Sequence, residues 1–85
     1  MDGEPFYPAP LNSVRTPHGS KRGHSGRSRP VLARLVWPRG AIIVAARLAW
    51  VDGDAVCIEW ERRGVNRRTW IPRKDIALWL PLPKP

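Results

Sequence analysis

The sequence has few of the residues from which enzymatic and metal sites are usually built. It contains one cysteine, Cys57, and its two histidines, His18 and His24, lie in a polar stretch far from it. A lone cysteine cannot form an internal disulfide bond, and this spacing matches no zinc site. No nucleophile with an adjacent base can be named either. The sequence therefore predicts no catalytic residue, no metal ligand and no cofactor, and it argues against an enzyme.

Long hydrophobic runs are also missing. The longest, residues 41–46, is too short to cross a bilayer, and the first ten residues lack the apolar core of a signal peptide. We therefore expect a protein of the cytoplasm or the nucleoid, without a membrane partner. A chain of 85 residues holds at most one small domain. The core of such a domain is marginal and leaves little room for a deep substrate pocket.

Acidic residues are scarce beside basic ones. There are 15 Lys and Arg residues against 7 Asp and Glu residues, which gives a formal net charge of +8. Such an excess attracts phosphate polymers or an acidic protein surface, and charge alone does not choose between them. Codon bias is an alternative explanation, because a GC-rich genome would also produce a chain rich in Arg, Ala, Gly, Pro and Trp.

Residues 1–29 contain few aliphatic side chains and no periodic pattern, so we expect a disordered arm. Its first part, PFYPAPL at 5–11, is proline-spaced, and its second part, 13–29, carries no acid. The basic residues of the arm are Arg15, Lys21, Arg22, Arg27 and Arg29. Basic arms of this kind often lie along a phosphate backbone, and the alternative is a solvated linker that binds nothing.

Residues 30–80 consist of short apolar segments separated by turn signals, a pattern typical of strands. The predicted strands are 31–37, 41–50, 54–62, 65–71 and 76–80. The turn signals between them are Pro38-Arg39-Gly40, Val51-Asp52-Gly53, Arg63-Gly64 and Arg73-Lys74-Asp75. The predicted fold is therefore all-β, a small five-stranded barrel over 30–80, with a disordered basic arm before it and a proline-rich tail at 81–85.

The hairpin between the second and third predicted strands must place paired residues on one face. A three-residue loop with Gly53 in a left-handed conformation makes that face wholly apolar and points Glu59 and Glu61 outward. A two-residue turn would instead place acids on the apolar face, so we predict the three-residue loop. The predicted pairs are Leu48 with Val56, Ala46 with Ile58, and Val44 with Trp60. The same alternation assigns Trp50 and Trp60 to the core.

The segment TWIPRKDIALW at 69–79 resembles the end of a Src-homology-3-like barrel, in which a strand runs into Ile-Pro, makes one helical turn and resumes as a short strand. The first loop of this chain, Pro38-Arg39-Gly40, is too short to carry the residues that bind proline-rich peptides in that family. In this respect the chain is more similar to the Tudor and KOW branches. That resemblance implies binding to modified tails, nucleic acid, or transcription and ribosome components, although fold alone does not fix function.

The stretch ERRGVNRRTWIPRK at 61–74 surrounds one tryptophan with six cations. We predict a phosphate-binding surface in which the indole offers a stacking plane beside guanidinium groups. Its residues are Arg62, Arg63, Arg67, Arg68, Trp70, Arg73 and Lys74. Trp70 shares a strand face with Arg68, whereas Arg67 falls on the other face, so one of the two arginines must lie at the barrel edge or extend its stem over the core. The alternative is that Trp70 caps the barrel, and Glu59 and Glu61 could pair with Arg67 or Arg68 and neutralise part of the surface.

Two functions from different classes remain. The first is a small accessory protein, monomeric or weakly dimeric, that binds DNA or RNA largely through phosphate contacts with limited sequence preference. The second is a protein-interaction module, such as an adaptor or a phage-encoded inhibitor of a host protein, that uses exposed Trp and Arg side chains. Affinity for nucleic acid falls steeply with salt, whereas an aromatic-centred protein interface depends on salt only weakly.

Overall fold

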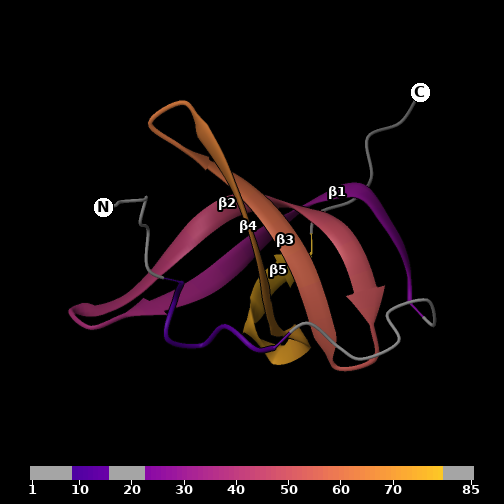
Figure 1. Cartoon of the computed structure of the whole chain (residues 1–85), viewed down its shortest axis with the longest axis horizontal. Coiled ribbons are helices and arrows are strands. Elements are labelled where there is room, and N and C mark those ends of the chain that lie inside the picture. Colours follow the sequence, from indigo (N-terminus) through magenta and orange to yellow (C-terminus); the bar gives the residue numbers. More distant parts are fainter. Residues whose placement is uncertain (1–8, 16–22, 80–85) are drawn as a thin grey trace.

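The computed structural model describes residues 9–15 and 23–79, and residues 1–8, 16–22 and 80–85 lie outside the described part. Within the described part the structure is all-β, as predicted, with five antiparallel strands and one turn of 3-10 helix (Figure 1). The strands are β1 (His24–Trp37), β2 (Gly40–Asp52), β3 (Ala55–Arg62), β4 (Val65–Pro72) and β5 (Ile76–Trp79), and the 3-10 turn is η2 (Arg73–Asp75). All five predicted strands are therefore confirmed.

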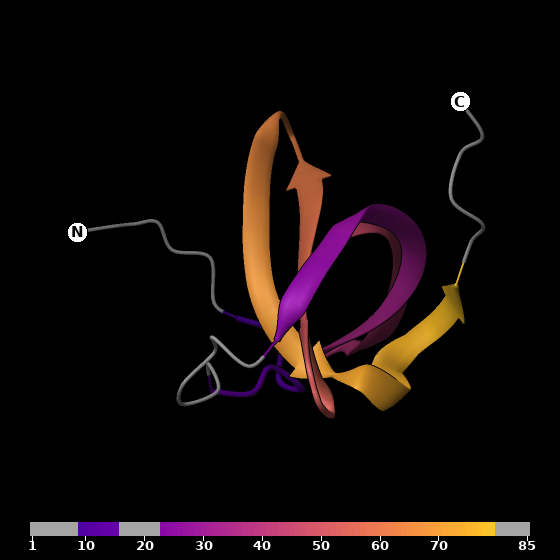
Figure 2. The same cartoon turned by 90° about the vertical axis from the view of Figure 1, so that its right-hand side faces the viewer.

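The strands form one sheet in the order β4-β3-β2-β1-β5. In Figure 2 the long strands β1 and β2 curl around, so the sheet folds back towards itself, which is consistent with a small β-barrel. Its concave side holds the core, which consists of Val31, Ala33, Leu35, Ala46, Leu48, Val51, Val56, Ile58, Trp60, Ile71 and Ile76. Most of these residues alternate along the strands with exposed or half-buried ones, as expected for a sheet with one face on the core, although Cys57 of β3 is buried on the other face.

The hairpin between β2 and β3 has a different register from the predicted one. Leu48 pairs with Ile58 rather than with Val56, and the loop has two residues, between the paired Asp52 and Ala55. A bulge between Leu48 and Trp50 absorbs the residue that the prediction had placed in a longer loop. The real register differs from the predicted one by two positions. The predicted apolar face therefore survives, because side chains alternate with a period of two.

The bulge changes the position of one predicted core residue. Beyond it, Val51 rather than Trp50 points into the core, with 5% of its surface exposed, and Trp50 pairs with Cys57 on the other face. The prediction that Trp50 belongs to the core face is therefore wrong. Trp60 is buried as predicted. The glycine of the turn, Gly53, has the predicted left-handed conformation with φ of 59°.

Strand β1 begins earlier than the sequence indicated. Residues 24–29, which were predicted to belong to the arm, form its first part and pair with β2. The ladder is irregular between Ser25 and Arg29, and within this irregularity Arg27 and Ser28 adopt φ values of 56° and 54°. This part of the strand has no apolar alternation, which is why its sequence pattern did not identify it.

Residues 9–15, also assigned to the arm, link two strands that do not pair with each other. The Leu11 N–H donates to the carbonyl of Val36 on β1 over 2.7 Å, and the Val14 N–H donates to the carbonyl of Trp70 on β4 over 2.8 Å. The segment therefore spans from one side of the curved sheet to the other (Figure 1). It satisfies backbone groups that would otherwise face water at the strand edges.

Asn12 anchors this segment to β1 and η2. Its side-chain amide donates to the carbonyl of Arg34 (2.9 Å) and to the carboxylate of Asp75 (3.0 Å), and its Oδ1 accepts from the N–H of Val36 (3.0 Å). Asp75 is buried, and it also receives a hydrogen bond from the Arg34 guanidinium at 3.2 Å. A buried carboxylate needs such partners, because an unpaired charge away from water is costly.

We predict that Gly26→Ala destabilises the fold. A Cβ at this position would lie 2.4 Å from the carbonyl oxygen of Leu48 and 2.6 Å from its Cγ. Backbone atoms cannot give way as a flexible side chain can, so we expect a loss of about 1–3 kcal/mol in the free energy of unfolding. Urea denaturation followed by tryptophan fluorescence measures it.

The matched control is Gly53→Asn. A Cβ at Gly53 would meet no atom within 4 Å, and asparagine tolerates the left-handed conformation better than most residues. The control is expected to lose much less stability than Gly26→Ala. Equal losses in the two variants would show that the close approach of Gly26 to β2 is not what makes that position sensitive.

Candidate functional site

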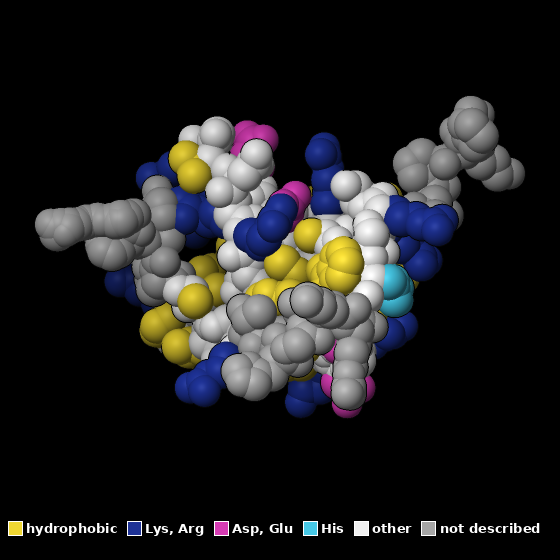
Figure 3. Space-filling model, turned by 45° about the vertical axis from the view of Figure 1, so that its right-hand side comes forward, with side chains coloured by type: hydrophobic (Ala, Val, Ile, Leu, Met, Phe, Trp, Pro, Cys, Tyr) yellow, Lys and Arg dark blue, Asp and Glu magenta, His cyan; other side chains and the backbone are white. Residues whose placement is uncertain are grey.

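The six cations predicted to form one surface at 62–74 do not lie together. Arg62 and Arg63 lie at the turn between β3 and β4, whereas Arg73 and Lys74 follow the opposite end of β4. The strand β4 that separates the two pairs has 8 residues and spans about 26 Å. In Figure 3 basic side chains are likewise spread around the rim of the molecule rather than gathered in one block.

The two arginines in the middle of β4 point to opposite faces, as predicted. Arg67 pairs with Trp60 and lies half-buried on the core face, where its Nε and Nη2 atoms are buried. Arg68 lies on the outer face and is hydrogen-bonded through its Nε and Nη2 to Oε2 of Glu59. This ion pair raises the pKa of Arg68. It also neutralises part of the positive charge on this face, as one of the alternatives anticipated.

A different basic site forms where β1, η2 and β5 meet. The guanidinium carbon of Arg29 lies 5.2 Å from the centre of the Trp79 ring, and that of Arg73 lies 5.3 Å from it. Both distances are typical of cation–π contacts. Trp79 is held in place because it pairs with Val31 of β1 and packs against the core. We call Arg29, Arg73 and Trp79 the Trp79 cluster, and Lys74 follows Arg73 in the chain.

The sequence pointed to the cations of this cluster but not to their common partner. Arg29 was assigned to the arm, and Arg73 and Lys74 to the 62–74 surface, as two separate basic regions. Alternation along β1 places Arg29 on the same face as Val31, at the open end of the core, where its aliphatic stem can extend over apolar atoms. The signal that would have joined these residues is the pairing of the first strand with the last, because this pairing brings β5 with Trp79 next to β1.

A second feature is a shallow hollow on the outer face of β2, β3 and β4. Its volume is about 380 Å³, and it is lined by Ala49, Trp50, Cys57, Arg68 and Trp70. Trp50 and Trp70 both pair with Cys57, from opposite sides, so the two indoles flank the thiol. We call this feature the two-tryptophan hollow. Figure 3 shows hydrophobic side chains near the centre of the visible face, with basic and acidic side chains beside them.

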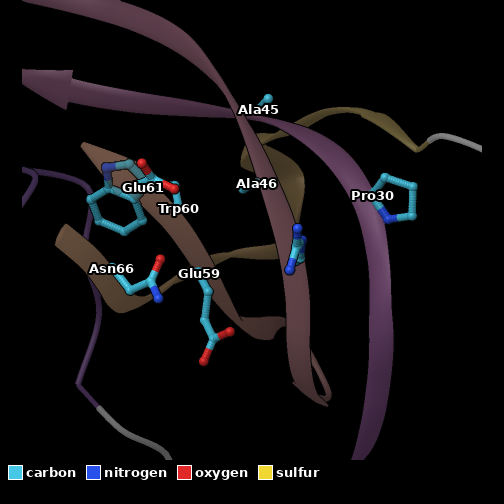
Figure 4. Close-up of a pocket in the computed structure, with 8 residues that line it drawn as sticks. Pro30, Ala45, Ala46, Glu59, Trp60, Glu61 and Asn66 are labelled. Atoms are coloured by element: carbon cyan, nitrogen blue, oxygen red, sulfur yellow. The ribbon is translucent and has the colours of Figure 1, made fainter. Parts of the chain in front are cut away.

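A wider groove separates β2 from β3 beyond the pair Arg47 and Glu59, where their ladder ends. It has a volume of about 470 Å³ (Figure 4). The lining residues are Pro30, Ala45, Ala46, Arg47, Glu59, Trp60, Glu61 and Asn66. Two of these are acids, and Glu59 is already bound to Arg68. This groove is therefore a poor surface for phosphate, and the basic sites lie elsewhere.

Some predicted residues cannot be assigned to a site. Lys21 and Arg22 lie outside the described residues, whereas Arg15 and Arg27 are described and exposed. Among residues 9–15 and 23–79, no three His, Cys, Asp or Glu side chains come together as metal ligands. In the same part of the chain, no helix is long and apolar enough to cross a membrane.

Comparison with known proteins returns no match of any kind. No protein-family model matches the chain, and neither a curated protein nor a solved structure is significantly similar to it. Its function therefore has to be argued from the geometry of the chain itself.

The Cys57 thiol at the floor of the two-tryptophan hollow provides a pH-dependent test of this site. Burial raises the pKa of Cys57, an effect that Arg68 partly offsets and Glu59 reinforces. The unfolded pKa is about 8.5. Because the pKa of Cys57 is higher in the folded state than in the unfolded state, the protonated thiol contributes to stability. This contribution is fully present below about pH 8.5 and is lost as the pH rises through the folded pKa. We expect thermal stability to fall more above about pH 8.5 in the unmodified chain than in Cys57→Ala. Parallel pH profiles would contradict the burial of this thiol.

Proposed function

We propose that this protein binds nucleic acid, largely through its phosphates and with limited sequence preference. The observation that carries the proposal is the convergence of Arg29 and Arg73 on the ring of Trp79, with Lys74 next in the chain. Guanidinium groups bind phosphate with two parallel hydrogen bonds. The shared indole ring keeps both groups close together.

The spacing within the cluster suits a polyanion. Because each guanidinium carbon lies near the same ring centre, the two are at most about 10.5 Å apart. Neighbouring phosphates of one strand are farther apart than the rise of about 3.4 Å per nucleotide along the axis, because they wind around the outside of the helix. The two arginines can therefore contact neighbouring phosphates of one strand. The net charge of +8 adds long-range attraction for the same partner.

We further propose that the sheet belongs to the Src-homology-3-like architecture, close to its Tudor and KOW branches. The support is the succession of β4, η2 and β5, in which Ile71-Pro72 leads into one helical turn and then a four-residue strand. The short turn between β1 and β2 also agrees with those branches. A monomeric or weakly dimeric state stays a prediction.

The test is the double substitution Arg29→Gln with Arg73→Gln. We expect it to weaken binding to both a short DNA duplex and a single-stranded RNA at low salt. Each phosphate contact adds about 0.9 to the slope of log affinity against log salt concentration, so this slope should fall by about one to two units. Fluorescence anisotropy over a range of salt concentrations measures both quantities.

The matched control is Arg39→Gln with Arg62→Gln, which removes the same amount of charge. Arg39 lies in the turn between β1 and β2, and Arg62 is the last residue of β3, at the end of β4 opposite to Arg73. Both are exposed, and neither is paired with a residue of the Trp79 cluster or its neighbours. The control should weaken binding only through net charge, with a smaller change in slope. Equal effects of the two double variants would refute a localised site.

A protein partner is the second candidate function, because one edge of β2 is open. Among the described strands, residues 40–46 of β2 pair only with β1, and this stretch carries no charge and no proline. Ile42 and Ile43 on it are 47% and 52% exposed. An extended peptide segment could add to such an edge by backbone hydrogen bonds.

We expect Ile43→Lys to prevent this pairing and leave nucleic-acid affinity unreduced. Loss of both interactions in a folded variant would rule out a separate edge site.

A further inference from the structure

We infer that the two-tryptophan hollow binds an unstacked nucleobase, so that the preferred ligand is a single-stranded nucleic acid. This inference rests on the proposed function and adds a second contact to it. The Trp79 cluster would hold phosphates of any nucleic acid. The hollow, in contrast, offers flat aromatic surfaces and no second cation beside Arg68 among its described lining residues.

The spacing of the two indoles suits a planar ring. Trp50 and Trp70 lie on either side of Cys57 in one row across three strands. Two strand spacings place their Cα atoms about 10 Å apart. Aromatic rings stack with their centres roughly 4.5–7 Å apart. A base that lies over Cys57 would therefore be within stacking distance of either indole.

The base of the hollow is closed, so a ligand would rest on it rather than enter the core. Cys57 is 3% exposed although it points to the outer face, away from Val56 and Ile58. Something must therefore cover it on that side, and the flanking indoles are the described side chains that line this position. A volume of about 380 Å³ lies within the range of small-molecule sites.

The charges beside the hollow favour a nucleotide over a neutral aromatic ligand. The neighbouring row of the sheet consists of Arg47, Glu59 and Arg68, which pair across β2, β3 and β4. Glu59 compensates one of the two arginines, so the row keeps one positive charge. A phosphate attached to the base would find this charge next to the stacking surface.

The proposed contact excludes a regular duplex. Bases in a double helix are stacked on each other, and only their edges are accessible in the grooves. A single strand can turn its bases out onto aromatic side chains without breaking base pairs. Stacking also tolerates any base, because every base has an aromatic face. The inference therefore agrees with limited sequence preference.

The experiment compares Trp70→Thr and Trp70→Phe with the unmodified chain, using a labelled oligothymidine and a DNA duplex of the same length. Threonine keeps the strand propensity of this position and removes the ring. We expect Trp70→Thr to weaken binding to the oligothymidine by about fivefold to a hundredfold, as for loss of one stacking aromatic. Duplex binding should stay within about twofold, and Trp70→Phe should keep most of the single-strand affinity.

Amide spectra of each variant establish that it is folded, and Trp50→Thr with Trp50→Phe repeats the comparison from the other wall of the hollow. Loss of oligothymidine affinity in both threonine variants, with duplex affinity retained, supports the inference. Equal affinity for the two ligands, unchanged in Trp70→Thr, overturns it and leaves the proposed function standing. Failure of the unmodified chain to bind either ligand at low salt overturns both.

Discussion

The structure depends on one irregularity in the middle of β2. Ala49 is an extra residue in the ladder to β3, and on its other side it faces three residues of β1, between Ser25 and Arg29. Such bulges bend a strand and increase its twist. The longest two strands can therefore curl around a small core instead of continuing as a flat ribbon. Both candidate sites also depend on it, because the bulge turns Trp50 to the outer face and Arg29 is the first paired residue of β1 after the irregularity.

The curved sheet leaves a gap between β4 and β1, because these two strands do not pair with each other. The segment 9–15 spans this gap with backbone hydrogen bonds to both strands. Its position is fixed by the buried side chain of Pro10 and by a polar network, in which Asn12 and Arg34 both bind the buried carboxylate of Asp75. A core this small gains specificity from such a network, because its partners can be satisfied in only one arrangement.

Alternation of apolar residues predicted the strands and the core face well, and it failed where alternation is interrupted. Trp60 lies on β3, whose ladder to β4 is regular, and is buried as expected, whereas Trp50 follows the bulge at Ala49 and is turned outward. An alanine between apolar neighbours carries no sign of a bulge. Residues 24–29 were missed for the opposite reason, because a strand held by backbone pairing needs no apolar pattern. The role of Trp79 required the pairing of β5 with β1, which is a long-range contact.

The arrangement of the arginines matters more for partner choice than their number. Arg34 and Arg68 are bound to Asp75 and Glu59, so their charges are compensated close by. Arg29 and Arg73 share the ring of Trp79 within a distance comparable to the screening length at physiological salt. Two like charges held this near repel each other, and the ring offsets only part of that repulsion. Under the proposed function a phosphate would offset more of it, so the placement of these two arginines bears on the choice of partner more than the net charge of the chain does.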